Sequence, residues 1–298
     1  MLNPDIAYLL GMIVGKGQIV RGQQMTEVLI DIPHKNLTLE NQNTQQSIKA
    51  SLLDLIMRLR PLIGAELIVD ADNPRITHLR FEKQNQDYLV RTINEYLQLQ
   101  RNYRSFRIPK EMYDASPDIR REFLKGFCDV TAHIRKSNAA FGQSWGHRVY
   151  IEVVDNWEVV ADVANLLETL DVPVQTIRWG HPNFVDPSQK YYRQGVHNYK
   201  EHQIKIWAEE FEKIGFTIEH KNQLLHTFAK INHEEHKKLG KSQTLSQEHH
   251  RYFWQTRDTA KKTAPHPDEH LASIPSSLRG RHFNSWKEIA IELGYGPK

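Results

Sequence analysis

The chain has 298 residues, of which 39% are hydrophobic and 25% charged, as is usual for a soluble globular protein with one large or two medium-sized domains. Its formal net charge of +3 permits binding to a polyanion without requiring it, because net charge does not say where the charges lie. The single cysteine, Cys128, excludes an intrachain disulfide and a cysteine-based zinc site and is expected in the core, while the lack of a signal-peptide pattern or a long apolar run predicts a cytoplasmic protein with no membrane partner.

Residues 1–115 show the patterns of a helix, two strands, a helix, two strands and a helix. Apolar residues recur at helical spacing in the first helix, and they alternate with polar residues in the second strand. The expected elements are a helix over Asp5–Gly15, strands over Gln18–Arg21 and Thr26–Pro33, a helix over Gln45–Leu59, strands over Ala65–Asp70 and Ile76–Phe81, and a helix over Gln86–Leu97.

The same order recurs in residues 116–232. The two opening helices contain Gly11 and Gly126, which are 115 positions apart, so the pattern indicates a duplication of one unit. The chain is therefore predicted to be α+β, with two pseudo-symmetric αββαββα repeats and a mostly helical or irregular carboxy-terminal extension over residues 233–298. The second repeat is expected to contain a helix over Glu122–Val130, strands over His133–Ser137 and Val149–Val154, a helix over Trp157–Leu170, strands over Val174–Trp179 and His202–Trp207, and helices over Glu209–Ile214 and Asn222–Asn232.

The two opening helices end in matching nine-residue segments. Leu9–Gly17 reads LLGMIVGKG and Leu124–Ala132 reads LKGFCDVTA, with glycine at the third position of each. Glycine inside a helix costs about 1 kcal/mol relative to alanine, a cost that close packing of two helices can offset. Both segments resemble the LAGLIDADG motif of homing endonucleases, and the resemblance covers about residues 4–232. It implies a monomer with internal pseudo-twofold symmetry, whose strands form one positively charged β-saddle on double-stranded DNA and protect roughly two turns of duplex.

In that family the eighth motif position is an acid, and the two acids hold divalent metal. Here the eighth positions are Lys16, whose ammonium repels Mg²⁺, and Thr131, whose hydroxyl is a weak ligand. The residual catalytic candidates are Asp129, at the sixth position, and Lys221, which matches the family's basic residue near the scissile phosphate. We therefore expect no metal or other cofactor, with Mg²⁺ required only if the chain is nevertheless a nuclease.

Period-two geometry, counted from the motif ends, selects the strand residues that would face DNA. Arginine and glutamine pair with base edges, whereas lysine mostly contacts phosphates. This counting gives Gln18 and Gln24 in the first repeat and His133, Arg135 and Ser137 in the second. The second hairpins add Arg75, His78, Arg80, Arg178, His202 and Lys205, and two loops that mix aromatic residues with hydrogen-bond donors add Gln143 and Arg193.

The sequence thus predicts sequence-selective binding of double-stranded DNA by a protein that is not an enzyme. One alternative is an active homing or restriction endonuclease that uses unconventional groups such as Asp129, His133 and Lys221. Another is an RNA-binding protein, like the LAGLIDADG proteins that assist intron folding. A saddle without positive potential would instead indicate a protein-interaction module. Histidine pairs such as His233 and His236 lack a fixed third ligand and predict no metal site.

Overall fold

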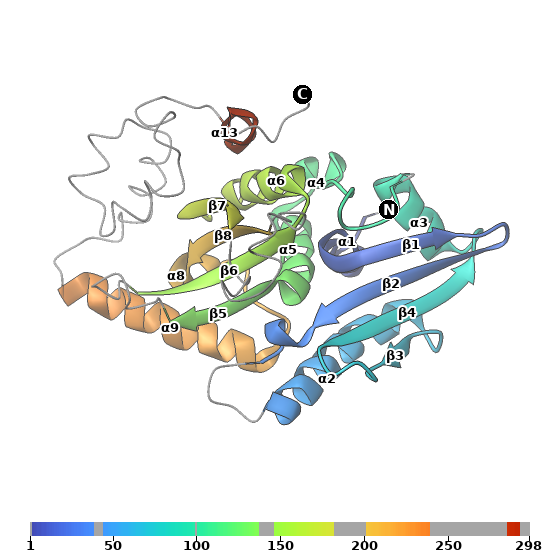
Figure 1. The fold of residues 1–298 in the computed structure, drawn as a ribbon, viewed down its shortest axis with the longest axis horizontal. Helices are drawn as coiled ribbons and strands as arrows, with labels where there is room; N and C mark the ends of the chain where they lie inside the picture. Colours follow the sequence, from blue (N-terminus) through green and yellow to red (C-terminus); the bar gives the residue numbers. More distant parts are fainter. Residues whose placement is uncertain are drawn as a thin grey trace, which may run out of the picture.

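The computed structural model describes residues 2–38, 44–98, 100–136, 146–181, 201–238 and 285–292. Within these residues the predicted αββαββα order occurs twice, which confirms the α+β fold class (Figure 1). Each repeat forms one antiparallel sheet of four strands, with the order β1-β2-β4-β3 in the first and β5-β6-β8-β7 in the second. The two sheets therefore have the same topology.

The bounds of the elements agree closely with the predicted ones. The first repeat consists of α1 (Pro4–Lys16), β1 (Gly17–Arg21), β2 (Met25–Pro33), the 3-10 turn η1 (His34–Asn36), α2 (Thr44–Ile63), β3 (Ile68–Asp70), β4 (Ile76–Gln84) and α3 (Tyr88–Leu97). The second consists of α4 (Glu111–Asp114), α5 (Pro117–Thr131), β5 (Ala132–Lys136), β6 (His147–Val154), α6 (Trp157–Glu168), β7 (Thr176–His181), β8 (Glu201–Trp207), α8 (Ala208–Phe211) and α9 (Glu219–Lys238).

Helix α5 begins five residues before its expected start at Glu122, and two other helices run well past their expected carboxy-terminal ends. Helix α2 continues through Pro61, because Leu55, Leu59 and Ile63 go on burying the same face and this packing compensates for the hydrogen bond that proline cannot donate. The helix then ends at Gly64, whose φ of 90° suits glycine. Helix α9 passes the expected end at residue 232, because no glycine or proline interrupts residues 233–238.

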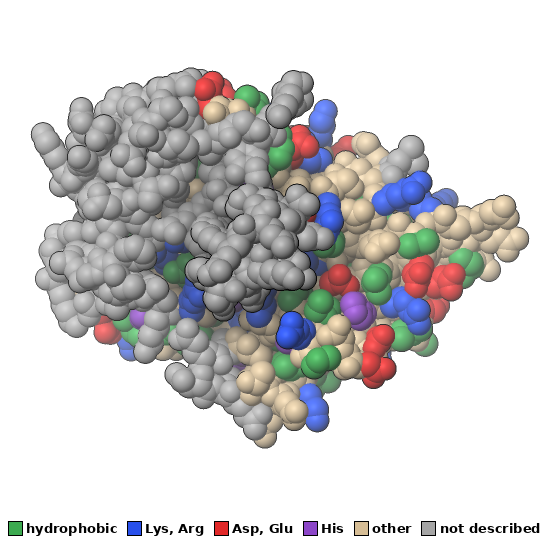
Figure 2. Space-filling model, in the orientation of Figure 1, with side chains coloured by type: hydrophobic (Ala, Val, Ile, Leu, Met, Phe, Trp, Pro, Cys, Tyr) green, Lys and Arg blue, Asp and Glu red, His purple; other side chains and the backbone are tan. Residues whose placement is uncertain are grey.

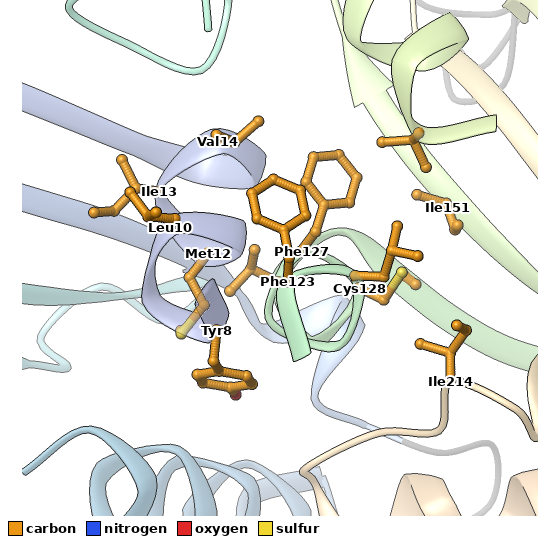
Figure 3. Close-up of a cluster of buried hydrophobic side chains, with 14 of the residues drawn as sticks. Tyr8, Leu10, Met12, Ile13, Val14, Phe123, Phe127, Cys128, Ile151 and Ile214 are labelled. Atoms are coloured by element: carbon orange, nitrogen blue, oxygen red, sulfur yellow. The ribbon is translucent and has the colours of Figure 1, made fainter. Parts of the chain in front are cut away.

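The core is continuous across the two repeats. Helices α1 and α5 lie side by side between the two sheets, with Phe123 and Phe127 among the side chains packed where the helices meet (Figures 1 and 3). Cys128 is buried in the same cluster, as predicted, and burial raises the pKa of its thiol. The helix pair thus joins the repeats into one body.

The described part of the carboxy-terminal extension is the short helix α13 (Trp286–Glu292), which packs on α6. The Trp286 side chain is fully buried, and its Nε1 donates a hydrogen bond to Oε1 of Glu168 at 2.8 Å. This short helix therefore packs against the second repeat. None of the described helices has the length and apolar character needed to cross a membrane.

Candidate nucleic-acid interface

The contact between α1 and α5 is reciprocal. A Cβ atom added at Gly11 would lie 2.0 Å from the backbone oxygen of Phe123, and one added at Gly126 would lie 2.0 Å from the backbone oxygen of Tyr8. Tyr8 and Phe123 each precede the glycine of their own helix by three residues, so the two contacts are related by pseudo-twofold symmetry. Both glycines are required because the backbones touch at these points.

The two helix ends that follow this contact carry no carboxylate. Lys16 ends α1, and its ammonium lies 5.3 Å from the centre of the Tyr103 ring. Thr131 ends α5, where its buried hydroxyl donates a hydrogen bond to the backbone oxygen of Phe127 at 2.6 Å. In the described parts of the chain, no group of three or more His, Cys, Asp or Glu residues is arranged to hold a metal ion.

Asp129 and Lys221 are both fully buried. The Asp129 carboxylate accepts hydrogen bonds from the Tyr8 hydroxyl at 2.7 Å and from the backbone amide of Thr217. Lys221 donates to the backbone oxygen of Ala132 at 2.9 Å. Burial raises the pKa of Asp129, although the nearby positive charge of Lys221 acts in the opposite direction. Burial also lowers the pKa of Lys221 to about 8. Both groups therefore point into the protein, where they cannot touch a phosphate on its surface in this conformation.

The strand pairings define equivalent positions in the two sheets. The row Gln18, Leu29, Arg80 and Ile68 crosses the first sheet, and the row His133, Tyr150, Lys205 and Thr176 crosses the second. In the first sheet, burial alternates along each long strand, so this row lies on the outer face, away from the core. We call the two sets of equivalent positions the first and the second outer face. The side chains of the first are exposed or half-buried, whereas several of the second are at most 5% exposed, namely Arg148, Tyr150, Glu152, Gln203, Lys205 and Trp207.

The first outer face is not positively charged. Its carboxylates belong to Glu27, Asp31, Asp70 and Glu82. The cation Arg80 lies 3.5 Å from Glu27, and His78 Nδ1 lies 2.8 Å from Asp31. Figure 2 shows acidic side chains interspersed with basic and hydrophobic ones on the right of the view, where Figure 1 places the first sheet. The expectation of one positive saddle shared by both repeats was therefore wrong for the first repeat.

The second outer face gathers cations around aromatic rings. The Arg135 guanidinium lies 4.5 Å and the Lys205 ammonium 5.6 Å from the centre of the Tyr150 ring, and the His133 ring stacks on the same ring. The Arg148 guanidinium lies 4.4 Å from the Trp207 ring. Cation–π contacts of this kind hold long side chains in place.

One carboxylate, Glu152, lies among these cations. It pairs with Lys35 of the first repeat at 2.5 Å and accepts a hydrogen bond from Gln203 at 3.3 Å, while His133 Nδ1 lies 3.8 Å away. Burial favours the protonated acid, but the charges of His133 and Lys35 hold the pKa of Glu152 below its ordinary value. Burial, together with the nearby cation Arg135, lowers the pKa of His133 to about 4. At neutral pH the imidazole is therefore uncharged, and Lys35 is the cation that stabilises Glu152.

The predicted DNA-binding residues separate into groups. Gln18, His78 and Arg80 lie on the first outer face, and His133, Arg135 and Lys205 lie together on the second. Gln24 is exposed in the turn between β1 and β2, Arg75 is exposed just before β4, and Arg178 pairs in register with Gln203. Ser137, Gln143 and Arg193 lie outside the described residues.

The placement of His202 beside Lys205 was wrong. The two residues are an odd number of positions apart on β8, so they lie on opposite faces of the strand. His202 pairs with Val153 and is 2% exposed, on the face that also buries Ile204. It does not belong to the second outer face.

Sequence reasoning also missed several members of the second outer face. Contacts with residues on other strands, or with the other repeat in the case of Lys35, place these residues on this face. Such contacts cannot be read from the sequence of a single strand. The missed residues are Lys35, Arg148, Tyr150, Glu152 and Trp207. One signal in the sequence, the alternation over residues 148–152, puts Arg148, Tyr150 and Glu152 on the same side of the strand.

No protein-family model and no curated protein matches the chain. Among solved structures it is similar to I-DmoI in complex with DNA and Mn, with 16% sequence identity over 77% of this chain and 98% of that chain and a TM-score of 0.37. It is also similar to the LAGLIDADG meganuclease I-AabMI bound to uncleaved DNA, with 12% identity over 79% of this chain and 92% of that chain and a TM-score of 0.39. Identities and TM-scores this low carry no conclusion about activity.

Proposed function

We propose that the chain is a monomeric, sequence-selective protein that binds double-stranded DNA on a LAGLIDADG-type scaffold. The observation that supports this most strongly is the reciprocal backbone contact at Gly11 and Gly126, the third position of both motif-like segments. Each helix of the pair passes directly into the first strand of its sheet, at Gly17 and at Ala132. This geometry accounts for why two glycines occur at equivalent helical positions despite their cost.

We further propose that the chain does not cleave DNA by metal-dependent chemistry. Mg²⁺ requires hard oxygen ligands, preferably carboxylates, on both sides of the reacting phosphate. The residues present do not fit this ion, because Lys16 brings a cation to one helix end and the Thr131 hydroxyl is engaged by the helix backbone at the other. Asp129 cannot substitute for them, because Tyr8 and Thr217 hold its carboxylate in the interior.

The second outer face supplies the chemistry for binding. The half-buried Arg135 carries a guanidinium at the edge of this face, and the half-exposed Lys35 pairs there with Glu152. Arg148 and Lys205 are buried and do not contact a ligand in this conformation. Guanidinium groups can contact both phosphates and guanine edges, so this face suits both general attraction and sequence reading.

The test is selection of bound duplexes from a random pool at about 50 mM salt, followed by affinity measurements over a salt series. The proposal predicts a pool that converges on one sequence and an affinity that falls as salt rises. Absence of any bound duplex at low salt would refute DNA binding. Structured RNA that outcompetes the selected duplex would replace the proposal with RNA recognition.

Cleavage is tested separately, by incubating supercoiled plasmid with the protein and Mg²⁺ or Mn²⁺. The proposal predicts intact plasmid for the natural chain. Nicking that disappears in Asp129→Asn would overturn it and assign a catalytic role to that carboxylate. Nicking that persists in Asp129→Asn would also overturn it, and would place the chemistry elsewhere.

A further inference from the structure

The connector between the repeats, residues 100–110, runs along the edge of the first sheet. The backbone amide of Ile19 in β1 donates a hydrogen bond to the backbone oxygen of Arg101 at 2.7 Å. Next to this bond, Gln18 and Asn102 pair as an antiparallel bridge. The start of the connector therefore forms the margin of the first sheet, beside β1.

Arg21, the last residue of β1, is held at this margin by three neutral oxygen atoms. Its Nε donates to Oδ1 of Asn94 on α3 at 2.8 Å. Its Nη1 donates to the backbone oxygen of Gln100 at 2.8 Å, and its Nη2 donates to that of Gln98 at 2.5 Å. A guanidinium has five N–H donors, so two remain for a ligand. These bonds fix the position of the Arg21 guanidinium without neutralising its charge.

A second guanidinium, that of Arg101, lies close by. Arg101 follows Gln100 in the chain, and its side chain is exposed. Burial, and after it the positive charge of Arg101, lowers the pKa of Arg21, so the two like charges repel each other. Among the described residues, no carboxylate forms an ion pair with either guanidinium. Two adjacent arginines without an acid are suited to an anionic ligand, because arginine is the side chain that best matches phosphate geometry.

Another arginine of the connector shows the contrast with a structural role. Nε of Arg107 lies 2.6 Å from Oδ2 of Asp162, and its Nη1 lies 2.6 Å from Oε1 of Glu158. The hydrogen bonds that Asp162 accepts raise the pKa of Arg107, and the ion pairs tie the connector to α6. The pKa of Arg21 moves the other way, because no carboxylate offsets its burial and its cationic neighbour.

We infer that Arg21 and Arg101 together bind a phosphate group of the duplex backbone at the margin of the first sheet. This inference rests on the proposed function, and it assigns a phosphate contact to the repeat whose outer face has no excess of positive charge. The two remaining N–H groups of Arg21 and the exposed guanidinium of Arg101 can donate charge-assisted hydrogen bonds to phosphate oxygens.

The place of this pair suits a contact with the backbone rather than with bases. Gln18 and Val20 point outward from β1, whereas Arg21 has the opposite parity and reaches towards α3. Figure 2 shows Lys and Arg side chains together at the upper right of the view, where Figure 1 places β1 and α3, apart from the acidic side chains lower on the sheet. In a duplex lying on the first outer face, base edges face the strands and phosphates pass the margin.

Two matched variants test the pair. Arg101→Gln and Arg60→Gln each remove one exposed guanidinium, and Arg60 on α2 is the control because it too has no ion pair with a described carboxylate. We expect Arg101→Gln to weaken binding of the selected duplex about tenfold and to reduce the salt slope by about 1. A scrambled duplex should lose the same factor, because a phosphate contact carries no sequence information. Arg60→Gln should change neither quantity.

Two further measurements separate a ligand contact from a structural role. Arg101→Lys keeps the positive charge and should keep the salt slope of the natural chain. Arg101→Gln should melt no lower than the natural chain, because removing one of two like charges relieves their repulsion. A clearly lower melting temperature would assign the side chain a structural role and overturn the inference.

The source of the phosphate is tested with the free ion. Melts of the natural chain and of Arg101→Gln are compared in potassium phosphate and in potassium chloride of equal ionic strength. If phosphate stabilises only the natural chain while the duplex salt slopes of the two chains are equal, the site takes free phosphate and its assignment to the duplex is overturned.

The outcomes keep this inference distinct from the proposed function. If the natural chain binds no duplex at low salt, the proposed function fails and the inference fails with it. If the natural chain binds a duplex and Arg101→Gln binds it with the same affinity and salt slope, the inference is overturned while DNA binding stands.

Discussion

The two sheets have the same strand order and the same register, yet their outer faces are chemically opposite. In the first, Glu27, Asp31, Asp70 and Glu82 outnumber a single arginine, and in the second, cations surround Tyr150 and Trp207. Most inward positions are apolar in both sheets, as at Val28 and Val149. The fold therefore constrains the inward side chains and the helix contact, whereas the outer positions differ in burial as well as in charge, as Val20 is exposed and Trp207 buried.

The largest effect should come from the feature that the two halves share. Gly11→Ala and Gly126→Ala each place a methyl group 2.0 Å from a backbone oxygen, so each should reduce the free energy of unfolding by more than ~3 kcal/mol. Urea unfolding measures both, and the two losses should be similar. Gly22→Ala, in the β1–β2 turn where the nearest contact is 3.0 Å, is the control with a small effect. Unequal losses at Gly11 and Gly126 would contradict the symmetry of the contact.

The next effect is confined to the second half. Asp129 is matched in the first repeat by the buried Val14, at the same motif position. Lys221→Met leaves the Asp129 carboxylate uncompensated and should cost ~3–5 kcal/mol. Adding Asp129→Val, which copies the first repeat, should restore most of that loss. Chemical denaturation of the single and double variants provides the comparison, and a double variant no more stable than Lys221→Met would argue against a coupled pair.

The same lysine predicts a dependence of stability on pH. Because the pKa of Lys221 is lowered to about 8 in the folded chain, the unfolded chain binds more protons between pH 8 and the ordinary lysine pKa of 10.5. The contribution of Lys221 to stability should therefore rise as pH increases through that window. Denaturation of the natural chain and of Lys221→Met at several alkaline pH values isolates this contribution from other groups. A stability difference between the two chains that does not change with pH would contradict the lowered pKa.

The smallest effect concerns the acid that both sheets retain. Asp31 and Glu152 occupy equivalent positions, but Glu152 is buried and pairs with Lys35, whereas Asp31 is half-buried beside His78. Glu152→Gln removes the buried ion pair and should lower the free energy of unfolding by about 1–2 kcal/mol. Asp31→Asn should change it by less than about 0.5 kcal/mol. Urea unfolding of the two variants distinguishes them, and equal losses would contradict the difference in burial.

Much of the fold was predictable because its signals are local. Helical spacing in α1 and α5, alternation in β2, and the recurrence of Gly11 at Gly126 identified both repeats. The carboxy-terminal ends of α2 and α9 could not be predicted. In α2, packing of the apolar face outweighs the helix-breaking tendency of Pro61, and in α9 no glycine or proline marks an end at residue 232. Local patterns thus determine which elements form better than where they end.

The site was less predictable because it depends on distant pairings. Lys35 and Glu152 are 117 positions apart, and only the packing of η1 against the second repeat brings them together. The grouping of His202 with Lys205 ignored strand alternation, which places residues three positions apart on opposite faces. The burial of Asp129 also required the tertiary structure, since its partner Tyr8 comes from the other helix of the pair.

The most direct test of the proposed function is hydroxyl-radical footprinting of the natural chain on a selected duplex. Binding by the joined pair of repeats predicts one bound site with protection spread over roughly two helical turns, about 20 base pairs. A selected duplex that shows no protected segment at about 50 mM salt would contradict DNA binding on this scaffold.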